Sequence, residues 1–159
     1  MSLSRAQLDL LRAFERGLDP RYPERSEIPA TVLGYGEIST VFAIQAETLQ
    51  GLAFKRLPLF HNEGEVEAYL VAYAEYNRLL QEEIGLHLPG DSHAAFPNSA
   101  GRPIVYLIQK RLPAPSIGNR VMQALTPDRV RVLFRRILQE MQRVWEFNQG
   151  QDRLQVALD

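Results

Sequence analysis

The strongest constraint on the fold is a series of short apolar runs, separated by glycines, between two stretches of helical periodicity. The runs are rich in β-branched and aromatic residues and occupy 28–33, 40–46 and 52–57. Gly34 and Gly36 separate the first two runs, and a turn sequence at 48–51 separates the second from the third. This punctuation predicts an antiparallel meander of three strands. The chain must therefore fold around a sheet.

Helical periodicity precedes and follows the meander. Residues 4–18 predict a helix with Ser4 as its N-cap, because apolar residues recur there at helical spacing. Two prolines in the segment 19–26 prevent that helix from continuing. Residues 62–84 predict a long helix with one apolar stripe, which Gly85 ends.

The second half of the chain adds strands and more helix. Strands are expected near 94–97 and 103–110, and the second is apolar enough to be buried on both faces. A short helix is expected at 116–124. A longer one runs from Thr126, its N-cap, to about Asn148. We expect an α+β fold with about five antiparallel strands, one long helix packed on the sheet and a helical segment after it.

The predicted domain organisation is that of a truncated protein. Residues 1–27 form an N-terminal helix and linker, 28–112 a lobe with the sheet, and 113–159 a partial helical region. Residues 154–158 alternate like a strand and stop at Asp159 with no partner strand after them. A lone terminal strand suggests a piece of a longer protein.

Composition argues against several classes of function. The chain has no cysteine, which excludes thiol catalysis and thiolate metal sites and suits a reducing cytosol. Its 18 basic and 19 acidic residues argue against a sequence-independent grip on nucleic acid or anionic lipid. No apolar run reaches the roughly 18–20 residues that span a bilayer. We expect a cytoplasmic protein with no nucleic-acid, membrane or zinc site, since His61, His87 and His93 are isolated.

The residues that carry chemistry lie in the meander. Gly34-Tyr35-Gly36 opens the first hairpin, and glycines at this spacing let backbone amides approach a phosphate, although ordinary turns also contain them. Lys55, one of only two lysines, falls on the third predicted strand. From there its ammonium can reach phosphates held by the hairpin. The alternative is that Lys55 extends from an exposed strand face into solvent.

A phosphate-binding lysine needs a carboxylate to hold its ammonium in place. Glu75, in the middle of the helix predicted at 62–84, is our candidate because the small residues Ala68 and Ala72 share its side. Glu67 is the second candidate. The alternative for Glu75 is a place on a solvated helix face.

Together these features resemble the N-terminal lobe of the protein-kinase-like superfamily. They are, in order, Gly34-x-Gly36-x-x-Ser39-x-Val41, then Ala53-Phe54-Lys55, a Glu-bearing helix, and a buried strand that runs into Gln109-Lys110-Arg111-Leu112. Their order and spacing look closer to the aminoglycoside-phosphotransferase-like and atypical kinase branches, in which Ser often replaces the third glycine. The resemblance covers 28–112 and, more loosely, 116–148.

The resemblance implies a role for each matching residue in binding ATP with Mg²⁺. The residues that would cover the phosphates are Gly34, Gly36 and Ser39. Lys55 would contact the α- and β-phosphates, and Glu75 would orient Lys55. The residues that would surround the adenine are Val41 and Ala53 in the roof, Ile108 at the back, and the backbone of Gln109, Lys110 and Arg111 along its edge.

The sequence lacks two parts of the kinase pattern. It has no His-Arg-Asp or His-Gly-Asp catalytic loop and no Asp-Phe-Gly metal-binding motif. Asp159 stands about where the catalytic Asp would, with nothing after it. We therefore expect an ATP-binding fragment of a larger phosphotransferase or pseudokinase, catalytically incomplete as given, whose phosphoryl acceptor the sequence does not name.

The alternative function is non-enzymatic: an α+β protein-binding or oligomerisation module with a degenerate kinase-like fold. The helix predicted from 127 supports it, because exposed apolar residues on that helix could bind a partner or a second copy. Trp145 on this helix is predicted to lie in the core. The helix also carries five arginines, which predict a solvated face or a surface for an acidic partner.

Overall fold

The computed structural model describes residues 2–152 and 156–157 and has an α+β fold. The chain forms two compact units. The first contains the described residues up to Tyr69 together with Pro89–Arg111. The second contains Leu70–Leu88 and the described residues from Leu112 onward. The boundary between the units falls within one helix. The segment 70–88 belongs to the second unit, although the strands before and after it in the sequence belong to the first.

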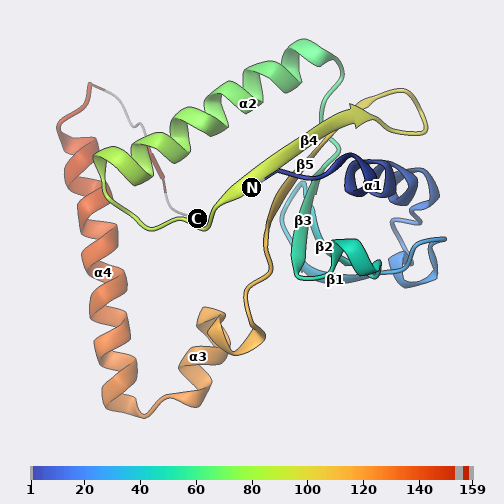
Figure 1. The fold of residues 1–159 in the computed structure, drawn as a ribbon. Coiled ribbons are helices and arrows are strands. Elements are labelled where there is room, and N and C mark those ends of the chain that lie inside the picture. Colours follow the sequence, from blue (N-terminus) through green and yellow to red (C-terminus); the bar gives the residue numbers. More distant parts are fainter. Residues whose placement is uncertain (1, 153–155, 158–159) are drawn as a thin grey trace. The chain divides into compact units, whose positions relative to one another are not determined.

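The first unit is built on one five-stranded sheet (Figure 1). Its strands are β1 (Ala30–Tyr35), β2 (Thr40–Ile44), β3 (Leu52–Leu57), β4 (Asp91–Pro97) and β5 (Pro103–Lys110). The order across the sheet is β1-β2-β3-β5-β4, and every neighbouring pair is antiparallel. The predicted meander is confirmed, as are the two later strands. β5 lies between β3 and β4, and its residues 104–108 are all buried.

Helix α1 (Arg5–Gly17) covers one face of this sheet. Ser4 begins it as predicted, in a capping box in which the Gln7 amide donates to Ser4 Oγ and the Ser4 amide donates to Gln7 Oε1. Leu11 and Phe14 of α1 are fully buried and join core residues of all five strands. We call this side of the sheet the α1 face.

A buried charge cluster joins α1 to the sheet. Glu15 lies on the apolar side of α1, and its side chain is only 4% exposed. Arg56 of β3 donates from Nε and Nη2 to its two carboxylate oxygens at 2.9 and 2.7 Å. The hydroxyl of Tyr106, on β5, donates to Glu15 Oε2 at 2.5 Å. Three groups that are costly to bury alone thus satisfy one another.

Helix α2 (Glu63–Arg78) follows β3, and together with the π-helical turn after it the helical segment covers 63–83, close to the helix predicted at 62–84. Asn62 caps its start by accepting from the Glu65 amide at 2.9 Å. The Glu65 carboxylate accepts from the backbone amide of His61, and this hydrogen bond lowers the pKa of Glu65. After Arg78 the helix widens into a π-helical turn at Leu79–Glu83, and Gly85 follows with a φ of +75°.

The second unit contains the end of α2, helix α3 (Gly118–Ala124) and helix α4 (Pro127–Gln149). Pro127 opens α4 after Thr126, as predicted. Leu80, Ile84, Val144 and Val156 form its small core. The side chain of Asn148 holds the backbone of Val156, donating to its carbonyl and accepting from its amide. Of the strand predicted at 154–158, only Val156 and Ala157 are described, without regular structure, and Asp159 lies outside the described residues.

No helix in the described part of the chain has both the length and the apolar character needed to cross a bilayer.

Removing Glu15 should destabilise the first unit. Glu15→Ala leaves the Arg56 guanidinium buried without its partner, and breaking a buried pair in this way costs about 3–5 kcal/mol. Urea unfolding measures the loss. Glu24→Ala, which removes an exposed carboxylate 4.0 Å from Arg25, is the matched control and should change the unfolding free energy by less than about 1 kcal/mol. Equal effects of the two substitutions would contradict this account of the cluster.

The same cluster predicts a loss of stability at alkaline pH. Burial and the neighbouring Glu15 charge raise the pKa of the Tyr106 phenol above its ordinary value of 10.0. The unfolded chain releases this proton first, so the contribution is complete below about pH 10 and is lost as the pH rises further, by up to about 1.4 kcal/mol per pH unit. Urea unfolding from pH 9 to 11 should show a shallower decline in Tyr106→Phe. Parallel declines would contradict the prediction.

Candidate functional site

The sheet register gathers several of the predicted site residues on the face opposite α1. Directly opposed residues of antiparallel strands point to the same side, and side chains alternate along a strand. Lys55 is opposed by Val41 of β2 and Leu107 of β5. Gly34 opposes Val41 at the end of the same row. Ala53, two residues from Lys55, opposes Gln109. We call this side the Lys55 face.

The glycine hairpin closes one end of this face. The Gly36 amide donates to the Ser39 carbonyl at 2.8 Å, and the tip exposes the side chains of Tyr35 and Ile38. Ser39 is buried, and its Oγ lies 2.6 Å from where a Cβ on Gly36 would stand. A side chain at position 36 would therefore force Ser39 Oγ to move. A Cβ on Gly34 would meet no atom within 4 Å, so the fold itself does not require that glycine.

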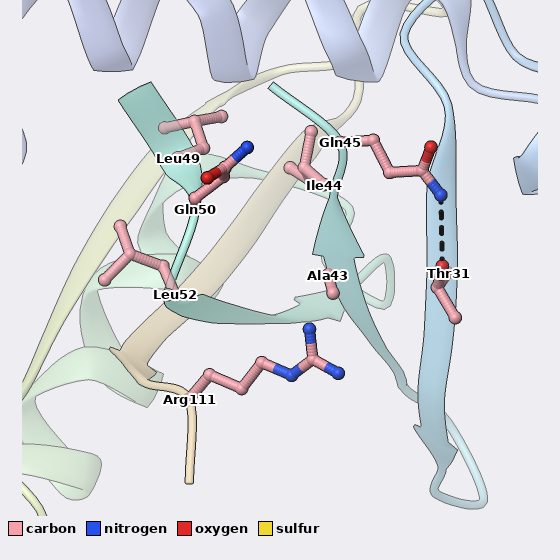
Figure 2. Close-up of a pocket in the computed structure, with 9 residues that line it drawn as sticks. Thr31, Ala43, Ile44, Gln45, Leu49, Gln50, Leu52 and Arg111 are labelled. Carbon is pink, nitrogen blue, oxygen red and sulfur yellow. Dashed lines mark hydrogen bonds between the residues drawn. The ribbon is translucent and has the colours of Figure 1, made fainter. Parts of the chain in front are cut away.

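The described structure places a pocket of about 550 Å³ at the other end of the Lys55 face. It is lined by Thr31, Ala43, Ile44, Gln45, Leu49, Gln50, Gly51, Leu52 and Arg111. Figure 2 shows the Arg111 side chain running from the end of β5 along the pocket, with the guanidinium toward the β2 side. The Arg111 amide donates to the Gly51 carbonyl at 2.7 Å, and Gln45 Nε2 donates to Thr31 Oγ1 at 3.2 Å.

Lys55 and Arg111 place positive charge at two separated points of the same face. Lys55 is exposed, and no carboxylate among the described residues forms an ion pair with it. Gly51, which lines the pocket, lies four residues before Lys55, and four residues of extended strand span about 13 Å. An elongated anion with a ring at one end could contact both points at once.

Two predicted site residues lie on the other side of the sheet. Ile108 opposes Phe54 and Ser92, is fully buried, and packs with α1. Its side chain therefore belongs to the α1 face and not to the Lys55 face. Lys110 opposes Leu52, which shares the side of Phe54, and is exposed. Side chains alternate along β5, so Gln109 points to the Lys55 face, whereas Ile108 and Lys110 point to the α1 face.

The predicted carboxylate partner, Glu75, is held by a different residue. Both of its oxygens accept hydrogen bonds of 2.9 Å from Arg78, which lowers the pKa of Glu75. Glu75 belongs to the second unit. Glu67, the second candidate, is exposed and belongs to the first unit with Lys55.

Within residues 2–152 and 156–157, no three His, Asp or Glu side chains converge on a point that could hold a metal ion. Asp159, predicted near the position of a catalytic Asp, lies outside this range.

The sequence did not predict the polar residues of the pocket or the buried charge cluster on the α1 face of the sheet. Thr31, Gln45 and Gln50 sit in strand or turn sequences with no motif around them. Glu15 did carry a signal, because it interrupts the apolar side of an amphipathic helix between Leu11 and Leu18. A charge at such a position indicates a buried partner.

Comparison with protein-family models gives no match for this chain, and comparison with curated proteins finds no similar sequence.

The two hairpin glycines should respond differently to substitution. Gly36→Ala places a methyl group against Ser39 Oγ and should lower the unfolding free energy by about 1–3 kcal/mol. Gly34→Ala meets open space and should leave it unchanged within about 0.5 kcal/mol. Urea unfolding of both variants tests this, and a larger loss in Gly34→Ala would show that the hairpin packs differently.

Proposed function

We propose that the first unit binds ATP with Mg²⁺ on the Lys55 face, as the N-terminal lobe of a kinase-like phosphotransferase or pseudokinase. The observation that carries the proposal is the sheet register, which aligns Gly34, Val41 and Lys55 in one row. The Arg111 pocket lies at the other end of the same face. The phosphates would lie at the hairpin end and the base at the pocket end.

The order of the elements supports this assignment. In protein kinases a glycine-rich loop covers the phosphates, and the phosphate-binding lysine lies on the third strand of the lobe, ahead of a helix that supplies its glutamate. Here the hairpin joins β1 to β2, Lys55 lies on β3, and α2 follows β3 directly. A fold built by chance around a glycine turn would not need to put its lysine on that strand and that face.

The residues of the Lys55 face fit a magnesium nucleotide in charge and shape. Lys55 and the amides of the hairpin would hold the phosphates, with Val41 and Ala53 against the base or sugar. Arg111 and the backbone beside it would meet the polar edge of the base. When bound, Mg²⁺ would neutralise charge on the phosphates. The described residues provide no metal ligand set of their own, so the proposal is limited to nucleotide binding.

Glu75 is the proposed carboxylate partner of Lys55, with Glu67 as the alternative. To serve in this role, Glu75 must first release Arg78. The ion pair with Arg78 is exposed, and such pairs contribute little to stability, so its loss costs little. Glu67 is exposed and lies in the same unit as Lys55.

The proposal predicts a lysine-specific loss of nucleotide binding. Mg²⁺–ATP at a hundredfold excess over its Kd should stabilise the chain by about 2.7 kcal/mol and raise its thermal midpoint by several degrees. Lys55→Ala removes a charge-assisted contact of about 1.5–3 kcal/mol, so the Kd should rise by roughly 10- to 100-fold. Thermal unfolding with and without Mg²⁺–ATP or Mg²⁺–ADP, followed by calorimetry, measures both effects.

Lys110→Ala is the matched control, because it removes the exposed side chain of the other lysine, which lies on the α1 face, and keeps the backbone that the proposal places at the base. It should bind nucleotide like the wild type. Retention of the full shift in Lys55→Ala, or its equal loss in Lys110→Ala, would contradict the proposed site.

The alternative, a non-enzymatic interaction module, is favoured by a different observation. Helix α4 exposes several large apolar side chains, Trp145 among them, although Trp145 was predicted to lie in the core. This surface is separate from the Lys55 face in sequence and in unit, so the two functions can be tested separately.

A further inference from the structure

Helix α4 carries an apolar seam that its own unit leaves uncovered. The seam consists of Phe134, Leu138, Met141 and Trp145, which are 56%, 47%, 52% and 62% exposed. The neighbouring Val144 is buried in the small core of the second unit, so α4 contributes to that core through an adjacent stripe. Among the described residues of the second unit, α4 therefore has two apolar stripes, one packed in the core of the unit and one exposed.

The spacing of the seam is that of a helix–helix interface. Its residues follow one another at intervals of four, three and four, which is the pattern of alternating core positions in a coiled coil. On a helix of 3.6 residues per turn they fall within one narrow stripe. A solvated helix face has no reason to keep four large apolar residues in this register.

We propose that the seam pairs two copies of this chain through antiparallel packing of α4 on α4. The seam is symmetric about the midpoint between Gln139 and Glu140. Antiparallel packing about that point joins Phe134 of one copy to the Trp145 position of the other, and Leu138 to the Met141 position. A two-fold interface needs this kind of self-complementary surface.

The charges of α4 favour the antiparallel arrangement. Its first half, 127–136, carries four arginines and one aspartate, for a net charge of 4 − 1 = +3. The half from 139 to 149 carries two glutamates and one arginine, for 1 − 2 = −1. Antiparallel packing sets these opposite charges against each other, whereas parallel packing sets the arginines against themselves.

The alignment of individual charged residues also favours antiparallel packing. Antiparallel packing about the same midpoint places Glu146 of the second copy level with position 133, between Arg131 and Arg135. These three charged residues lie on the same flank of the seam, one step round the helix from it. Each of the two equivalent clusters would then contain one glutamate from one copy and two arginines from the other.

The seam is long enough for a dimer of modest affinity. Helix α4 has 23 residues and extends over about 34 Å. It offers four apolar layers, and large aromatic side chains occupy the outer two. A helix pair of this size lies near the lower limit of stable protein interfaces, so we expect reversible association that depends on concentration.

Sedimentation velocity or light scattering over a concentration series tests the proposal. The mass should rise from 18.1 kDa toward twice that value as concentration increases. Leu138→Asp places a charge in the seam and should keep the chain monomeric. Gln139→Asp adds the same charge to an exposed position beside the seam, and should still dimerise. Two results would overturn the proposal. One is a wild-type chain that stays monomeric, which would leave a different protein as the partner of the seam. The other is a dimer that Leu138→Asp does not weaken.

Disulfide trapping tests the orientation, and the cysteine-free chain suits it. In the antiparallel pair, the two copies of position 134 are 11 residues apart along the axis, or about 16 Å, too far for a disulfide. Phe134→Cys alone and Trp145→Cys alone should therefore not cross-link, whereas their equimolar mixture should form the mixed disulfide. Cross-linking of each variant alone would indicate parallel packing, and no cross-linking in the mixture would also overturn the proposal.

Discussion

The hydrogen-bonded cluster of Glu15, Arg56 and Tyr106 is the interaction on which the first unit depends. A carboxylate that is 4% exposed is tolerable only because a guanidinium and a phenol satisfy it. The three residues come from α1, β3 and β5, so the cluster fixes both the face that α1 covers and its position along the strands. Purely apolar packing would specify neither as strictly, since apolar contacts have no direction.

Fixing α1 on one face assigns every strand residue to a side. Side chains alternate along a strand, so once Arg56 points toward α1 its neighbour Lys55 must point away. The same rule carries Ala53, Val41 and Gln109 to the side of Lys55 and sends Ile108 into the core. The proposed nucleotide site is thus a consequence of the buried cluster on the opposite face. Because the two faces share one backbone, a slip of one residue in β3 would exchange Lys55 with the arginine that holds Glu15.

The second unit is held together by a small apolar core. Helix α4 meets this core through Val144, while the seam from Phe134 to Trp145 remains exposed. The helix therefore packs in its unit through one stripe and leaves another exposed, which is the stripe we propose for self-association. The two proposed activities, nucleotide binding and self-association, use different residues in different units.

The sequence by itself determined where the helices and strands lie, because glycines, prolines, N-caps and the change of hydrophobic period act over a few residues. It also predicted a functional role for the glycine hairpin and for Lys55, one of only two lysines in the chain. It did not determine that Trp145 is exposed, that Ile108 lies under α1, or that Arg78 holds Glu75. Periodicity shows which residues share a face but not what covers that face, and a uniformly apolar run such as 104–108 does not show which side each residue takes. Only the tertiary structure decided these points, because burial, strand register and ion pairing depend on contacts between segments far apart in the sequence.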